Sequence, residues 1–249
     1  MFNFFKKIGD LFKSRKSGDV SAIILCAGNS TRFSNENENK QLYQINGKSV
    51  VCHTIEAFQN CTSIRDIILV VRREDAEQYE KLVCLNNYYK VDCIVVGGET
   101  RQISAMRGFK HVSDKCKYVA IHDGARCLVT PDMINLVISE ARTYSAASAA
   151  SLVSDTVKVT DDNGFVIKTI SRENMWNVQT PQVFEKDLYA LCVENAKERA
   201  ITVTDDCMLV ESYGHQVKLV ETGKTNLKIT VKDDVLVAEG ILKSREIKK

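Results

Sequence analysis

Two patterns of hydrophobic positions alternate along most of the chain. Unbroken apolar runs, which are typical of strands buried on both faces, recur with amphipathic segments of helical spacing between them. Strands are predicted at residues 20–26, 66–72, 91–98, 117–126 and 146–153, and helices at 49–58, 74–85, 101–112 and 131–144. Because helices separate the strands, the pattern indicates βαβ units and an α/β fold with a mostly parallel sheet flanked by helices.

The pattern changes after Val153. Residues 155–170 form two short alternating runs around the turn Asp-Asp-Asn-Gly, which predicts a β-hairpin arm, at about 154–170, protruding from the core. Further helices are expected at 185–199, 205–213 and 233–245, and further strands near 215–221 and 226–231.

The first nineteen residues differ in charge from the rest. Residues 1–19 carry five basic and two acidic side chains, a net charge of +3, so that residues 20–249 carry 29 − 30 = −1. Apolar residues recur there at helical spacing, which predicts a basic amphipathic leader before a single domain at 20–249. Such a leader can touch an anionic membrane or a partner. We expect instead a frayed segment, or a helix docked on the protein's own surface.

The composition excludes several classes of protein. The chain has 34 Lys and Arg against 32 Asp and Glu, a net charge of +2, which argues against a protein that coats nucleic acid. No apolar run approaches the roughly 18 residues of a membrane span. The nine cysteines include no Cys-x-x-Cys pair, so a zinc ribbon or redox motif is not expected. Reduced cysteines that behave as small hydrophobic residues indicate a cytoplasmic protein.

Candidate functional residues follow four of the predicted strands. In an open parallel sheet, ligands bind beyond the carboxyl ends of the strands. The residues there are Ala27, Gly28, Arg32 and Lys40 after the first strand, Gly98, Glu99, Arg101 and Ser104 after the third, Asp123 and Arg126 after the fourth, and Lys228 near the last. Small residues allow backbone N–H groups to approach an anion. Neither a P-loop nor G-x-G-x-x-G is present, so each loop alone is weak evidence and also fits an ordinary turn.

Taken together, these strand ends bring one acid and several cations to one rim of the sheet. This is the arrangement expected of a site for a nucleoside triphosphate. Asp123 suits a Mg²⁺ ligand that binds directly or through water; a role as a helix-cap or turn residue is the alternative.

An ordered set of motifs extends these observations over nearly all of residues 20–245. The motifs are A-G-x-x-x-R, K-Q, G-G-x-x-R-x-x-S, H-D-G-A-R, D-T, R-x-x-x-W-x-x-Q-T-P-Q, T-D-D and N-L-K-I-T. The set resembles the 2-C-methyl-D-erythritol 4-phosphate cytidylyltransferase family, which has a Rossmann-like sheet. The ribitol-5-phosphate cytidylyltransferases share much of it, but Trp176 favours the erythritol-phosphate family.

The resemblance implies a reaction and a set of roles. CTP and 2-C-methyl-D-erythritol 4-phosphate would give 4-diphosphocytidyl-2-C-methyl-D-erythritol and pyrophosphate, with Mg²⁺ as cofactor. Catalytic roles would fall to Arg32, Lys40, Arg172 and Lys228. Substrate contacts would fall to Ala27, Gly28, Gly98, Glu99, Arg101, Ser104, Asp123, Arg126 and Thr156.

The resemblance also implies a homodimer. The family's hairpin interlocks two subunits, so that Thr156 and Arg172 would reach the partner's site. Two alternatives stay open: transfer to ribitol 5-phosphate or another polyol phosphate, and a non-enzymatic module that binds nucleotide. The retained cations argue against the second.

Three loop residues depart from the family's pattern. Asn39 and Cys127 stand where proline is common, and Ser30 stands where glycine is common. These changes remove no charge, but they put the rigidity of the loops in doubt.

No general base is required for this chemistry. A phosphate monoester with a second pKa of about 6 is already mostly a dianion at pH 7, so neither His122 nor Asp123 is assigned as a base. We expect His122 to orient the Asp123 loop. Asp205 and Asp206 suit the cap of a helix, a structural role.

Overall fold

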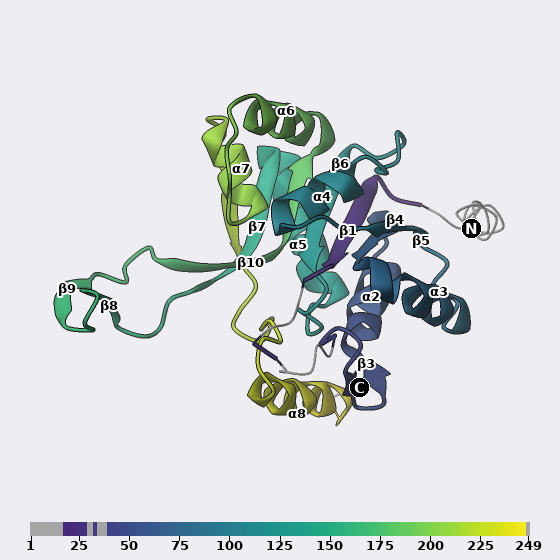
Figure 1. Ribbon diagram of the computed structural model, residues 1–249, viewed down its shortest axis with the longest axis horizontal. Helices are drawn as coiled ribbons and strands as arrows, with labels where there is room; N and C mark the ends of the chain where they lie inside the picture. The colour runs from purple at the N-terminus through teal and green to yellow at the C-terminus, as the bar shows by residue number, and fades with distance from the viewer. Residues whose placement is uncertain (1–16, 29–31, 34–38, 248–249) are drawn as a thin grey trace.

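The computed structural model describes residues 17–28, 32–33 and 39–247. Within them, seven strands form one sheet in the order β11-β7-β10-β6-β1-β4-β5 (Figure 1). The strands are β1 (Val20–Cys26), β4 (Ile64–Val71), β5 (Val91–Val96), β6 (Tyr118–Asp123), β7 (Ala146–Leu152), β10 (Trp176–Glu185) and β11 (Lys218–Glu221). Only β10 runs antiparallel to its neighbours in this sheet. The predicted α/β fold with a Rossmann-like, mostly parallel sheet is confirmed.

Helices cover both faces of the sheet. They are α2 (Val50–Asn60), α3 (Ala76–Leu85), α4 (Arg101–Phe109), α5 (Pro131–Tyr144), α6 (Lys186–Glu198), α7 (Asp206–Ser212) and α8 (Asp233–Ile247). In β1, Ala22 and Ile24 join an apolar cluster with α2, α3 and α5, whereas Ile23 and Leu25 join another with α4, α6 and α7. A strand buried on both faces is apolar at successive positions, which explains the unbroken run in the sequence.

The short elements lie between these helices and strands. They are the pair β2 (Gln44–Ile45) and β3 (Lys48–Ser49), the 3-10 helix η2 (Arg73–Asp75), and the pair β8 (Val157–Thr160) and β9 (Val166–Ile170). The β8–β9 pair is the expected arm, and it projects to the left of the body in Figure 1. Three consecutive apolar side chains near its tip are exposed, Phe165 by 73%, Val166 by 58% and Ile167 by 64%.

The hydrophobic pattern does not predict β10, which lies between β6 and β7 in the sheet. Its buried half contains Gln179, Thr180 and Gln182, so it lacks the apolar run of a central strand. The amide of Gln182 donates to Asp205 Oδ2 at 2.8 Å, and its carbonyl oxygen accepts from the backbone N–H of Asp206 at 3.0 Å. Buried polar groups of this kind are tolerated because they are hydrogen-bonded.

The strand expected near 226–231 is wrong, because these residues form no strand. The backbone N–H of Ile229 instead donates to the carbonyl of Ala125 at 2.8 Å, beyond the end of β6. Because β6 ends at Asp123, residues 226–231 have no neighbouring strand among the described residues to pair with. They therefore form a loop, although their sequence alternates like a strand.

The cysteines agree with the expectation from the sequence. Seven of the nine are buried and none forms a disulfide; Cys93 is partly buried, and only Cys84 is exposed. No helix in the described part of the chain is long and apolar enough to cross a membrane. Residues 1–16 of the expected leader lie outside the described residues.

Candidate active site

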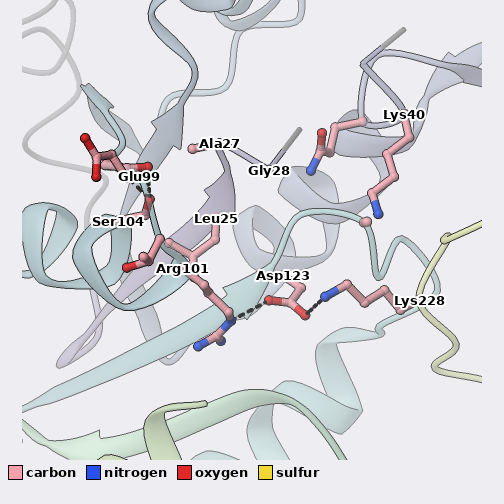
Figure 2. A pocket seen from close by; sticks show the side chains of 13 residues that line it. Leu25, Ala27, Gly28, Lys40, Glu99, Arg101, Ser104, Asp123 and Lys228 are labelled. Atoms are coloured by element: carbon pink, nitrogen blue, oxygen red, sulfur yellow. Dashed lines mark hydrogen bonds and ion pairs between the residues drawn. The ribbon is translucent and has the colours of Figure 1, made fainter. Parts of the chain in front are cut away.

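A cavity of about 250 Å³ opens at the carboxyl ends of β1, β5 and β6 (Figure 2). Nine of the residues singled out in the sequence line it. They are Ala27, Gly28, Lys40, Gly98, Glu99, Arg101, Ser104, Asp123 and Lys228. The fold therefore brings together, beyond the strand ends, residues that lie up to 201 positions apart in the sequence, from Ala27 to Lys228.

Asp123 is the centre of the charges in this cavity. Its Oδ1 accepts from Arg101 Nε at 3.1 Å and its Oδ2 from Lys228 Nζ at 2.7 Å, as Figure 2 shows. Burial alone would raise the pKa of Asp123, but the charges of Arg101 and Lys228 outweigh it and hold the pKa well below its usual value. The carboxylate therefore stays ionised and anchors two cations at the rim.

Arg101 connects this cluster to a second buried carboxylate. Its Nη1 lies 2.6 Å from Asp206 Oδ2, and Tyr189 donates its hydroxyl to Asp206 Oδ1, also at 2.6 Å. Burial lowers the pKa of Arg101, but the charges of Asp206 and Asp123 more than compensate and raise it above the usual value. Arg101 is thus a permanent cation that lines the cavity.

The expectation that Asp205 and Asp206 both act as cap residues is half right. Asp205 is the N-cap of α7 and accepts from the backbone N–H of Met208 at 2.9 Å. Asp206 is instead the buried partner of Arg101. Nothing in the local sequence distinguishes the two, because the partner lies 105 residues away.

Lys40 is buried at the edge of the cavity, with 9% of its surface exposed. Burial, followed by the charges of Lys228 and Arg32, lowers the pKa of Lys40 to about 8. These two charges act on Lys40 because all three cations share one region. Arg32 itself is exposed and does not line the cavity.

His122 organises the loop that follows β6. The Asp123 N–H donates to Thr180 Oγ1 at 3.0 Å, and Thr180 Oγ1 lies 3.1 Å from His122 Nδ1. On the other side of the ring, His122 Nε2 lies 3.2 Å from the Arg126 carbonyl oxygen. All three bonds are satisfied when the imidazole is neutral with its proton on Nε2. Burial lowers the pKa of His122 to about 3, so it remains neutral and orients the loop, as expected.

The loop after β5 lines one part of the cavity. Gly98 donates its N–H to Ser104 Oγ at 3.0 Å. A Cβ on Gly97 would lie 2.4 Å from the Cβ of Ala27, and a Cβ on Gly98 would lie 2.2 Å from Ile103 Cγ2. Only glycine fits at either position, which explains the pair Gly97-Gly98.

The comparisons with known proteins identify the family of this chain. The sequence model of the 2-C-methyl-D-erythritol 4-phosphate cytidylyltransferase (IspD) family matches residues 20–244. The chain belongs to this family. The cytidylyltransferase of Alkaliphilus oremlandii is 42% identical over 227 residues, 91% of this chain and 96% of the relative, and that of Caldanaerobacter subterraneus subsp. tengcongensis is 43% identical over 226 residues, 90% and 99%.

A solved structure from the same family has the same fold. The 4-diphosphocytidyl-2C-methyl-D-erythritol synthase of Anaerococcus prevotii superposes with a TM-score of 0.78 at 30% identity, over 91% of this chain and 99% of that one. The fold and the sequence therefore identify the same cytidylyltransferase family.

Besides Arg32, three of the candidate site residues do not line the cavity. Thr156 and Arg172 are exposed on the arm, where Arg172 donates to the carbonyl of Ser154. Arg126 lies beside the cavity: its Nε is 4.0 Å from Asp123 Oδ2, and its Nη1 donates to the Asn226 carbonyl at 2.8 Å.

Two of the departures from the cytidylyltransferase pattern have clear surroundings. Asn39 Nδ2 donates to Asp75 Oδ2 at 2.6 Å, and its Oδ1 accepts from the Gln41 N–H at 3.0 Å, so the amide holds the turn that carries Lys40. Cys127 is buried, which raises the pKa of its thiol to about 12, and it acts as an apolar residue. Ser30 lies outside the described residues.

The carboxylates of the cavity are few. Asp123 and Glu99 are the acids that line it, and the described residues contain no group of three or more His, Cys, Asp or Glu side chains that could hold a metal. The donor set fits a hard divalent cation only where oxygens of a bound phosphate complete its coordination.

Proposed function

We propose that this chain joins CTP and 2-C-methyl-D-erythritol 4-phosphate, giving 4-diphosphocytidyl-2-C-methyl-D-erythritol and pyrophosphate. The observation that carries the proposal is the cluster of Lys40, Arg101 and Lys228 around the buried carboxylate of Asp123, in a chain of this family. The relatives named above carry the erythritol name, so the ribitol alternative is not favoured.

The main barrier to the reaction is electrostatic. The phosphate of the acceptor alcohol is mostly a dianion at neutral pH, and it must approach the triphosphate of CTP. Each pair of like charges 4 Å apart costs about 4 kcal/mol at an effective dielectric constant of 20. Cations at fixed positions offset this repulsion, and no proton has to be removed from the attacking oxygen.

The catalytic roles follow from charge and position. Arg32, Lys40 and Lys228 stabilise the charge that develops around the α-phosphorus as the acceptor oxygen attacks and pyrophosphate leaves. Lys228 is held at 2.7 Å from Asp123, so it reaches the phosphates from a fixed point.

The nucleotide base and ribose would occupy the part of the cavity lined by the loops after β1 and β5. Ala27, Gly28 and Gly98 present backbone groups there, and Glu99 and Ser104 lie beside them. Backbone donors and acceptors between small residues can select a base by its edge.

Mg²⁺ is the proposed cofactor. Asp123 would hold the ion through one oxygen, directly or through water, together with phosphate oxygens of CTP and water. When bound, the ion neutralises phosphate charge. Both oxygens of Asp123 already accept from cations, which favours contact through water.

The arm is proposed to form a homodimer and to complete the partner's site. Phe165, Val166 and Ile167 form an exposed apolar strip on it, which a second subunit would cover. Thr156 and Arg172 at its base would then contact the acceptor phosphate bound to the other subunit. We also propose that residues 20–249 form a single domain and that the protein is cytoplasmic.

A panel of acceptors tests the function. With CTP and Mg²⁺, pyrophosphate release should be fastest with 2-C-methyl-D-erythritol 4-phosphate and much slower with ribitol 5-phosphate. Faster release with ribitol 5-phosphate would reverse the assignment, and CTP binding without turnover of either acceptor would favour the non-enzymatic alternative.

A further inference from the structure

A third apolar cluster lies apart from the two that cover the sheet. Its buried members are Phe33, Ile45, Val50, Ala125, Cys127, Leu128 and Ile229, with Val235 and Ala238 of α8. They come from the segments after β1 and β6, from the β2–β3 region and from the loop after β11. The helix α8, at the bottom of Figure 1, closes this cluster.

Members of this cluster are the sequence neighbours of the site's cations. Arg32 is followed by Phe33, Arg126 by Cys127, and Lys228 by Ile229. The three apolar residues are 4%, 2% and 0% exposed. Adjacent residues share one peptide unit, so fixing the apolar residue also fixes the backbone from which the cation extends.

Two hydrogen bonds connect the pieces of this cluster. Ile229 donates its N–H to the Ala125 carbonyl at 2.8 Å, which joins the loop of Lys228 to the loop after β6. Arg245 of α8 donates its Nη1 to the Leu128 carbonyl at 2.8 Å. The helix, the loop after β6 and the loop of Lys228 therefore form one packed unit.

This packed unit can hold the cations of the site at fixed positions. Cations that must meet around a phosphate repel one another before the phosphate arrives. We propose that α8 and this third cluster are a positioning element for the active site, and that Ile229 is its central positioning residue. The proposal rests on the function proposed above. Ile229 does not line the cavity, so it acts through Lys228.

The test compares Ile229 with an isoleucine of equal burial elsewhere. Ile138 on α5 is also 0% exposed, but it belongs to the first cluster and no cation of the site is adjacent to it in the sequence. Each of the variants Ile229→Val and Ile229→Ala is compared with the same substitution at Ile138, and the loss of Tm is measured for all four variants. Steady-state kinetics are measured well below the lowest Tm.

A positioning role predicts a specific kinetic pattern. Since a displacement of about 1 Å can cost on the order of 100-fold in rate, Ile229→Ala should lower kcat at least about tenfold, with a much smaller change in the KM for CTP. Ile229→Val should recover most of the rate. The Ile138 variants should keep kcat within about twofold of wild type even where they lower Tm. Equal kcat in the two series would overturn the proposal.

Hydrogen exchange gives a readout that does not depend on activity. In Ile229→Val, peptides that span 123–128 and 226–231 should exchange faster, whereas peptides of β1 and β4 should not. In Ile138→Val these loops should keep their protection. Unchanged protection in the Ile229 variant would overturn the coupling even if the wild type had no transferase activity, so the two proposals fail separately.

Discussion

Replacing Lys40 by arginine should remove a loss of activity at alkaline pH that the lysine imposes. Burial and the charges of Lys228 and Arg32 lower the pKa of Lys40 from 10.5 to about 8. Above that pH the free enzyme loses a cation that the proposed mechanism requires. A guanidinium in the same place stays protonated, because its pKa is above about 12.

The size of the effect follows from the shift. A change of about 2.5 pKa units corresponds to about 3 kcal/mol against the charged amine in the folded protein. The shift sets the pH at which activity begins to fall, about 8. Because one required proton is lost, the value of kcat/KM, which reports the free enzyme, should fall about tenfold for each pH unit above that. Bound CTP adds negative charge beside Lys40 and raises its pKa, so kcat should fall only at higher pH.

The assay is pyrophosphate release at limiting CTP, from about pH 6.5 to about pH 10. The phosphate groups of both substrates titrate on the acid side of this range, so the alkaline limb belongs to the enzyme. Lys40→Arg should have a lower rate at neutral pH, because a fork replaces a point charge, but a flat profile above pH 8. Parallel alkaline limbs in wild type and Lys40→Arg would refute the assignment.

The same shift has a consequence for stability. Because the folded pKa of Lys40 lies below 10.5, the unfolded chain holds this proton more tightly. The destabilisation is fully present below about pH 8 and is lost as the pH rises to about 10.5, so the contribution of Lys40 to the free energy of unfolding increases across that window. Urea unfolding of wild type and Lys40→Met at the two ends of the window measures it.

Three further predictions follow from single residues. Arg32→Ala and Lys228→Ala should each lower kcat on the order of 10²–10³-fold in steady-state assays, with a smaller effect on the KM for CTP, as expected when one transition-state contact is removed; an unchanged kcat in both would contradict the roles assigned to them. Tyr189→Phe removes a 2.6 Å donor to Asp206 and should lower the free energy of unfolding by about 1–3 kcal/mol in denaturant titrations, whereas an unaltered midpoint would mean that this bond contributes nothing. Phe165→Asp on the exposed arm should halve the mass measured by light scattering and make Tm independent of protein concentration; a dimer of unchanged affinity would exclude the arm from the interface.

Much of the core could be predicted because burial on both faces leaves a local signature. The runs that became β1 and β4 are apolar at nearly every position, and the start of α5 at Pro131 follows from the preference of proline for the first helical turn. The burial of most cysteines could be predicted in the same way, since they lie in apolar runs and a buried thiol resembles any small apolar side chain.

The site was predicted less completely. Gly98 and Asp123 could be found because they stand at the ends of strands whose carboxyl ends share one edge. Lys228 lines the same cavity from a loop, although the sequence pattern had placed it in a strand. The pairing of Arg101 with Asp206 and Tyr189 could not be found, since no local pattern marks a partner about 100 residues away.

The sequence alone determined the alternation of strands and helices, the hairpin arm and the set of motifs that identifies the family, because each is a property of neighbouring residues. The tertiary structure decided where β10 inserts, which acid holds Arg101, and that α8 closes a cluster beside the cations. These features depend on which segments meet in space. A polar strand such as β10 becomes a central strand only when its partners, the N-terminal end of α7 among them, are present to satisfy its buried hydrogen bonds.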